Sequence, residues 1–178
     1  TVQETLNDLK EIFKEGLKNG IRTKCYVSVA YHCPYEGKVD GAYVKDVIGQ
    51  LIDYQVEELV IADTIGAANP KEVTSLLSSL KSQYKDTSFS CHFHDTRALG
   101  LANVYASLAA GINKFDSCIG GLGGCPFAPN SSGNLATEDL VSMLEMMNIK
   151  TGVNLDKLIH SRELASEYTS LSLKGRMI

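Results

Sequence analysis

Two histidines separated by a single residue, His92 and His94, have the clearest chemical meaning in this chain. They lie in the run Cys91-His92-Phe93-His94-Asp95. If residues 90–95 form a strand, alternate side chains point to the same face, and the two imidazoles project together. Imidazole pairs bind several transition metals, and added amide or carboxylate oxygens extend the choice to Mg²⁺ or Mn²⁺. Two structural core histidines are the alternative, but a position at the end of a strand favours a metal site.

A glycine-rich segment with a cysteine follows, Gly120-Gly121-Leu122-Gly123-Gly124-Cys125-Pro126. A flexible loop that carries a thiol can close over a metal site. The chain has five cysteines, an odd count that favours reduced thiols in the cytoplasm or the mitochondrial matrix. Cys25, Cys91 and Cys118 lie in apolar, strand-like runs and are expected to be buried and inert. Cys125 differs, because glycines precede it and a proline follows.

Three further polar residues are candidates for the same site. Asn134 lies just before a helix expected to begin near Thr137, and Glu138 falls in the first turn of that helix. Negative charge is favoured at a helix N-terminus in any case, so a structural role for Glu138 remains open. Asp63 ends an apolar run, where a catalytic role and a turn or capping role are both consistent with the sequence.

Composition sets limits on the kind of protein. The chain has 178 residues, of which 44% are hydrophobic and 21% are charged, with a net charge of −4. These values predict one globular domain, or a large part of one, spanning residues 1–178. Lys and Arg are scattered, so no nucleic-acid surface is expected. No apolar run approaches the roughly 18 residues that a membrane span needs.

Helix and strand patterns alternate along the chain. The apolar spacing predicts four strands and six helices. The strands are 25–31, 59–62, 89–95 and 114–119, and the helices are 1–20, 44–52, 70–80, 99–110, 137–147 and 154–168. Such alternation indicates βα units and a parallel sheet. Each strand ends in polar or glycine-rich residues, and these endings are expected to meet at one rim.

A (β/α)8 barrel needs eight βα units, and the four strands predicted here follow a helix. The expected fold is therefore α/β: the C-terminal half of a (β/α)8 TIM barrel, strands five to eight, with extra C-terminal helices and no N-terminal half. A small doubly wound α/β sheet is the alternative.

The combined motifs resemble the 3-hydroxy-3-methylglutaryl-CoA lyase family. The resemblance is carried by five segments and covers essentially the whole chain, thinning after about residue 165. The segments are 121–129 and 132–140, both read as a signature, together with Cys33-Pro34-Tyr35-Glu36-Gly37, Ala62-Asp63-Thr64-Ile65-Gly66 and His92-Phe93-His94-Asp95-Thr96. The cysteine loop is specific to this family, whereas isopropylmalate and homocitrate synthases share the His-x-His-Asp run.

The resemblance implies a lyase that cleaves 3-hydroxy-3-methylglutaryl-CoA to acetyl-CoA and acetoacetate, in leucine degradation and ketone-body formation. It implies a divalent cation, Mg²⁺ or Mn²⁺, held by three ligands. Other residues would supply the acid or relay, the polar layer and the substrate-facing loop. The implied metal ligands are His92, His94 and Asn134. Cys125 is the implied acid or relay, and Asp63 and Glu138 form the implied polar layer. Gly123, Gly124 and Tyr26 are implied to lie near the substrate.

Some parts of the family pattern are not found in these residues. An Asp-Arg pair, whose aspartate is a further metal ligand, and a later glutamate both belong to a missing N-terminal half. Lys24 also stands where the resemblance leads one to expect arginine. Two other functions remain open: a Claisen-type acyl-CoA synthase, and a non-catalytic half-barrel that self-associates. Exposed strand edges predict a homodimer or aggregation for the isolated chain.

Overall fold

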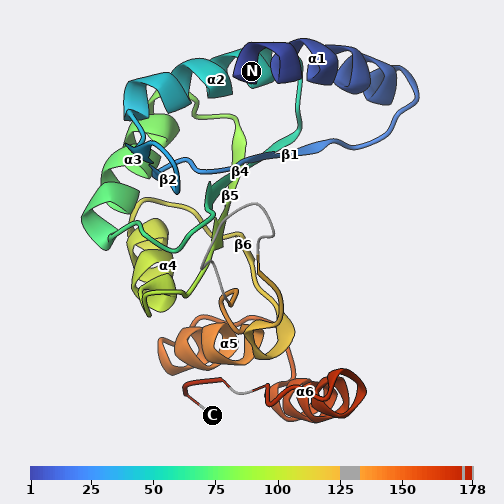
Figure 1. Cartoon of the computed structure of the whole chain (residues 1–178), viewed down its shortest axis with the longest axis vertical. Coiled ribbons are helices and arrows are strands. Elements are labelled where there is room, and N and C mark those ends of the chain that lie inside the picture. Colours follow the sequence, from blue (N-terminus) through green and yellow to red (C-terminus); the bar gives the residue numbers. More distant parts are fainter. Residues whose placement is uncertain (125–132, 174, 178) are drawn as a thin grey trace.

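A four-stranded parallel sheet forms the centre of the molecule. The computed structural model describes residues 1–124, 133–173 and 175–177. The strands are β1 (Lys24–Val27), β4 (Glu58–Asp63), β5 (Ser88–Phe93) and β6 (Phe115–Asp116), and they lie side by side in that order (Figure 1). All neighbouring pairs are parallel. The predicted parallel α/β architecture is therefore confirmed.

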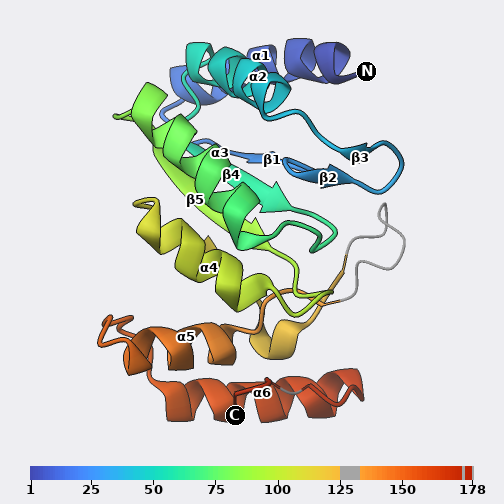
Figure 2. The ribbon, with the colours of Figure 1, turned by 90° about the vertical axis from the view of Figure 1, so that its left-hand side faces the viewer.

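Helices connect the strands and lie along one side of the sheet. The crossovers are α2 (Gly41–Asp53), α3 (Pro70–Gln83) and α4 (Gly100–Ala109), which lie along the same face in Figure 2. Strand order follows chain order, without the reversal that a doubly wound sheet contains. The remaining helices are α1 (Val2–Lys18), α5 (Thr137–Met146) and α6 (Leu155–Thr169). Among the described residues, no helix is both long enough and apolar enough to cross a membrane.

Local sequence signals explain where the helices begin. Thr1 and Glu4 form a capping box at the start of α1. Asn69 caps α3 by accepting from the backbone N–H groups of Lys71 and Glu72, and Pro70 occupies the first turn. These starts agree with the predicted ones, because they depend on residues close together in the chain.

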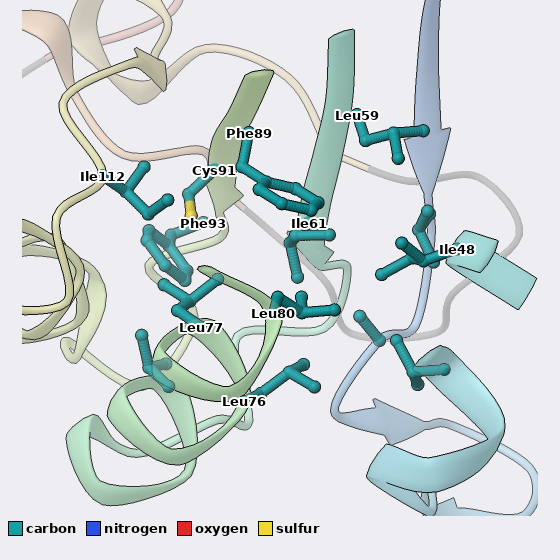
Figure 3. Close-up of a cluster of buried hydrophobic side chains, with 14 of the residues drawn as sticks. Ile48, Leu59, Ile61, Leu76, Leu77, Leu80, Phe89, Cys91, Phe93 and Ile112 are labelled. Carbon is teal, nitrogen blue, oxygen red and sulfur yellow. The ribbon is translucent and has the colours of Figure 1, made fainter. Parts of the chain in front are cut away.

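The hydrophobic core lies between the sheet and these helices. Alternate strand residues, including Leu59, Ile61, Phe89, Cys91 and Phe93, point toward α2 and α3 (Figure 3). Residues at the intervening positions form the opposite face of the sheet, which carries the polar side chains Tyr26, Ser90, His92 and Asp116. Because side chains alternate between the two faces of a strand, the polar candidate residues lie on one face of the sheet and the apolar core residues named above lie on the other.

Three features differ from the predicted strands. The first strand ends at Val27 and not at residue 31, since a turn follows in which Val29 has a positive φ of 50°. The antiparallel hairpin of β2 (His32–Cys33) and β3 (Gly37–Lys38) was not predicted. The last predicted strand, 114–119, shortens to β6, and a 3-10 turn, η1 (Ile119–Gly121), follows in which Gly120 and Gly121 adopt left-handed conformations.

Candidate metal centre at the carboxyl end of the sheet

His92 and His94 lie next to each other, as their spacing predicted. Their ring centroids are 5.2 Å apart and the rings meet edge to face. β5 ends at Phe93, and His94 continues the direction of the strand by forming an isolated bridge with Asn134. A backbone hydrogen bond from Leu135 N to the carbonyl oxygen of Phe93 supports that bridge. Backbone pairing thus brings Asn134 to the two histidines from 40 residues further along the chain.

Three polar atoms at this point are buried without a hydrogen-bond partner: Nδ1 of His92, Nδ1 of His94 and Oδ1 of Asn134. Buried polar atoms in folded proteins are nearly always paired, so three such atoms on neighbouring residues call for an explanation. The Asn134 Nδ2 donates to the carbonyl oxygen of Leu122 at 3.0 Å and contacts the Cys118 Sγ at 3.5 Å. The amide oxygen is therefore left as a free acceptor. Two imidazole nitrogens and one amide oxygen fit a divalent cation.

The donor set is only partial. No group of three His, Cys, Asp or Glu side chains suited to hold a metal occurs among the described residues, and the set here reaches three donors only by including an amide. Divalent cations with oxygen and nitrogen ligands commonly take six. Further donors must come from substrate, from water or from residues other than these.

Asp116 is a site residue that sequence reasoning missed. It is the direct neighbour of His92 across β5 and β6, and its Oδ2 lies 3.9 Å from the His92 Nδ1. The same Oδ2 accepts from the Tyr26 hydroxyl at 2.6 Å, while Oδ1 accepts from the Lys24 Nζ at 3.1 Å. The only sequence signal was an acid within the strand predicted for residues 114–119. Register across the sheet makes that acid a neighbour of the histidine.

The surroundings favour neutral histidines. Burial lowers the pKa of His92, an effect that the nearby Asp116 carboxylate opposes and Lys24 reinforces. Burial also lowers the pKa of His94, and positive charge on His92 would lower it further. Neutral imidazole is the form that binds a metal ion, so the environment keeps both side chains ready as ligands.

Two buried carboxylates hold the loops around the site. Asp63, at the end of β4, accepts from the backbone N–H groups of Ala67 and Ala68, at 3.0 Å each. Glu138 is fully buried, and both of its oxygens accept from Gly120 N, at 3.0 and 2.9 Å. Burial raises the pKa of Asp63, although the two N–H groups oppose that effect. In this structure both carboxylates bind backbone amides.

Close packing explains why two of the positions are glycine. A Cβ on Gly66 would lie 2.8 Å from the His94 carbonyl oxygen, and one on Gly123 would lie 3.0 Å from the Asn134 Nδ2. Both residues also have positive φ angles. Gly123 is thus packed against a candidate ligand, and Gly124 ends the described part of this loop. Cys125 lies outside the described residues.

The cysteines divide into two groups. Cys25 and Cys91 are buried, as predicted, and burial raises the pKa of Cys91 to about 12. Both thiols are therefore chemically inert at neutral pH. Cys118 was expected to be an inert core thiol, but it is only half-buried and contacts the Asn134 amide. Cys118 is half-buried because β6 ends before it, which leaves the thiol at the rim of the sheet.

Proteins of one known family resemble this chain over most of its length. A family model described as HMGL-like matches residues 2–165. The chain is 42% identical to the hydroxymethylglutaryl-CoA lyase of Bacillus subtilis, over 99% of this chain and 59% of that protein. It is 40% identical to the mitochondrial hydroxymethylglutaryl-CoA lyase of Homo sapiens, over 90% of this chain and 50% of that protein.

Solved structures agree with the sequence comparisons. An HMG-CoA lyase from Acinetobacter baumannii, in complex with coenzyme A and 3-methylmalate, superposes with a TM-score of 0.93 at 34% identity, covering 98% of this chain and 57% of that one. The carboxyl transferase domain of Rhizobium etli pyruvate carboxylase shares the fold alone, with a TM-score of 0.70 at 16% identity. The chain spans 50–59% of the length of the curated relatives named above.

Proposed function

Because the chain belongs to the HMGL-like family, we propose that it forms the metal-binding part of a hydroxymethylglutaryl-CoA lyase. The reaction would be the cleavage of 3-hydroxy-3-methylglutaryl-CoA to acetyl-CoA and acetoacetate, as in leucine degradation and ketone-body formation. One observation carries this proposal: the three unpartnered donor atoms of His92, His94 and Asn134 meet at the carboxyl end of a parallel sheet. That edge is where enzymes built on such sheets place their chemistry.

The sheet is proposed to be half of a (β/α)8 barrel. Support comes from strands in chain order with helices along one face, and from relatives of which this chain covers little more than half. In the closed barrel the polar face of the sheet would line the interior. That face carries His92, Tyr26 and Asp116, so a closed barrel would surround the candidate ligands with protein.

His92, His94 and Asn134 are proposed to hold Mg²⁺ or Mn²⁺. When bound there, the cation would polarise the substrate's tertiary hydroxyl group and favour loss of its proton. The chain's own residues would fix the geometry. The Asn134 amide is oriented through Leu122. The Asp116 Oδ2 lies 3.9 Å from the His92 Nδ1, the same nitrogen that is proposed to bind the cation. The negative charge of Asp116 beside that nitrogen would attract a divalent cation to the site.

The carboxylates and the loop thiol are assigned different tasks. The resemblance implies that Glu138 and Asp63 belong to the polar layer of the site. Since both already accept backbone N–H groups, we propose that they mainly position the turn at Gly120 and the loop at 64–68. Cys125 remains the proposed acid that protonates the departing enolate carbon, on a loop whose closure would exclude water. Tyr26, with half of its surface exposed on the polar face of the sheet, is proposed to lie near the substrate.

Acetoacetate release from 3-hydroxy-3-methylglutaryl-CoA in the presence of Mn²⁺ is the direct test. We expect the unchanged chain to release acetoacetate. In Cys125→Ser the rate should be about 10²- to 10⁴-fold lower, which is the usual contribution of a general acid. Cys33→Ser, at a half-buried thiol on the β2–β3 hairpin, is the control and should retain activity.

Three outcomes would contradict these assignments. Near-full turnover of Cys125→Ser with metal bound would reject Cys125 as the acid. Acyl transfer from acetyl-CoA to a 2-oxo acid, without cleavage activity, would support the synthase function. If the chain binds metal but shows neither activity, the result would support the hypothesis that it is a non-catalytic half-barrel.

Asp116→Asn is expected to weaken Mn²⁺ binding by about 10- to 100-fold, because it removes a negative charge close to the proposed position of the cation. Affinity is measured by electron paramagnetic resonance of free Mn²⁺. Tyr26→Phe is the matched control, because it removes the hydroxyl that donates to Asp116 but keeps the carboxylate. Equal affinities for Asp116→Asn and the unchanged chain would contradict the role of Asp116.

A homodimer is proposed as the state of the isolated chain in solution. β1 pairs only with β4 among the described strands, so one edge of its backbone is open. A cavity of about 450 Å³ beside that edge is lined largely by apolar side chains of α1, β1 and α2. Open strand edges and apolar surfaces favour self-association. The compartment, cytoplasm or mitochondrial matrix, also stays a prediction.

A further inference from the structure

The C-terminal segment, defined here by its described residues Leu173 and 175–177, returns to the rim of the candidate metal centre. Its contacts are with Asp95, Asp139 and Gly120, three residues that are far apart in the sequence. Asp95 follows the candidate ligand His94, and Asp139 follows Glu138. Two of the three contacts therefore lie directly beside a residue already assigned to the site, and the third, Gly120, donates to Glu138.

Asp139 anchors the backbone of this segment. It is buried, with 3% of its surface exposed, and its two oxygens accept from Arg176 N at 2.7 Å and Met177 N at 2.9 Å. Gly175 packs directly on the same carboxylate, since a Cβ there would lie 2.5 Å from the Asp139 Oδ1. A buried carboxylate needs such donors, and the C-terminal segment supplies them.

The Arg176 side chain reaches the other side of the site. Its Nε lies 3.1 Å from the Asp95 Oδ2, and its Nη2 donates to the Asp95 carbonyl oxygen at 3.4 Å. The Asp95 Oδ1 accepts from Gly100 N at the start of α4, and Asp95 N donates to the Gly133 carbonyl oxygen. Arg176 thus holds a residue that already connects the end of β5, the first turn of α4 and the segment that carries Asn134.

Leu173 provides an apolar contact at the third point. It packs on Gly120, where a Cβ would come within 2.6 Å of the Leu173 Cβ. Gly120 N is the donor that both Glu138 oxygens accept. One short segment therefore touches the turn after β6, the first turn of α5 and the residue after His94.

We propose that Arg176 is a positioning residue, which fixes His94 relative to the first turn of α5 by bridging Asp95 to the backbone anchored on Asp139. The guanidinium suits this task, because its planar fork can bind a carboxylate and a carbonyl oxygen of the same residue. Its importance for catalysis rests on the proposed function, whereas its effect on the geometry of His94 does not. A segment that merely covers the surface would leave the His94 ring unaffected when Arg176 is shortened.

The test compares Arg176→Ala and Arg176→Lys with the unchanged chain by nuclear magnetic resonance, at one pH and without metal. The readouts are the imidazole signals of the four histidines and the hydrogen-exchange rates of single amides. Arg176 is largely exposed, so the alanine variant should fold. His32 and His160, on β2 and α6, serve as internal controls, because among the described residues their ion-pair partners are Glu72 and Glu163 and not the C-terminal segment.

In Arg176→Ala we expect the His94 signals to shift while those of His32 and His160 stay in place. Exchange at the amides of Asp95 and Gly100 should rise by about 10-fold or more, because local opening is governed by local contacts. The Ile61 amide in β4 reports global stability and should keep its rate. Arg176→Lys keeps the positive charge but lacks the planar guanidinium group. In this variant the His94 signals should shift less than in Arg176→Ala.

Two results would overturn the proposal. Unchanged His94 signals and unchanged exchange at Asp95 and Gly100 would show that Arg176 does not position this turn. A rise of equal size at Ile61 would show a general loss of stability instead. Acetoacetate release is assayed separately on the same samples. If the unchanged chain lacks turnover but shows the expected shifts, the proposed function fails while the positioning role stands.

Discussion

His94→Ala is expected to lower the affinity of the chain for Mn²⁺ by more than about 100-fold, beyond the effect of losing a residue that only orients a ligand. The substitution removes one of three donor atoms that converge at the end of β5. The amide oxygen of Asn134 and the ring of His92 would remain, but two donors bind a divalent cation weakly. Electron paramagnetic resonance of free Mn²⁺ during titration measures the change.

His160→Ala is the matched control for this experiment. His160 is an exposed histidine on α6, and its nearest charged partner is Glu163, one turn away at 3.6 Å. The same substitution there should leave Mn²⁺ affinity unchanged. A similar loss in both variants, or none in His94→Ala, would mean that His92, His94 and Asn134 do not form the metal site.

Gly66→Ala is expected to lower the free energy of unfolding by about 2–5 kcal/mol. Part of this loss, about 1–2 kcal/mol, comes from placing a side chain at a positive φ of 59°. Overpacking adds about 1–3 kcal/mol, because the new methyl group would meet the His94 carbonyl oxygen at 2.8 Å and Thr96 N at 3.0 Å. Urea-induced unfolding gives the value.

Gly20→Ala separates the two contributions. Gly20 has a similar φ of 67°, but a Cβ there would meet no atom within 4 Å. This control should lose only the conformational part, and the difference between the two variants then measures the close approach of Gly66 to the His94 turn. Equal losses would contradict that close approach. Mn²⁺ affinity should fall in Gly66→Ala alone, because the backbone at His94 must move.

The helices and the central strands could be predicted because their signals are local. The capping box at Thr1, the Asn69-Pro70 start of α3 and the apolar run 59–62 each depend on residues within a few positions of one another. The pairing of His92 with His94 is local in the same sense, since side chains two positions apart in an extended chain share a face. The hairpin β2–β3 could not be predicted, because each of its strands is only two residues long and is too short to show an alternating pattern.

The sequence by itself determined the parallel α/β sheet, the polar carboxyl edge and the pair of histidines, because periodicity and spacing are properties of neighbouring residues. Only the tertiary structure decided which distant groups meet there. Asp116 reaches His92 through strand register, Asn134 reaches His94 through a bridge, and Arg176 reaches Asp95 through the returning C-terminal segment. Such contacts depend on the path of the whole chain, and no local pattern of residues encodes that path.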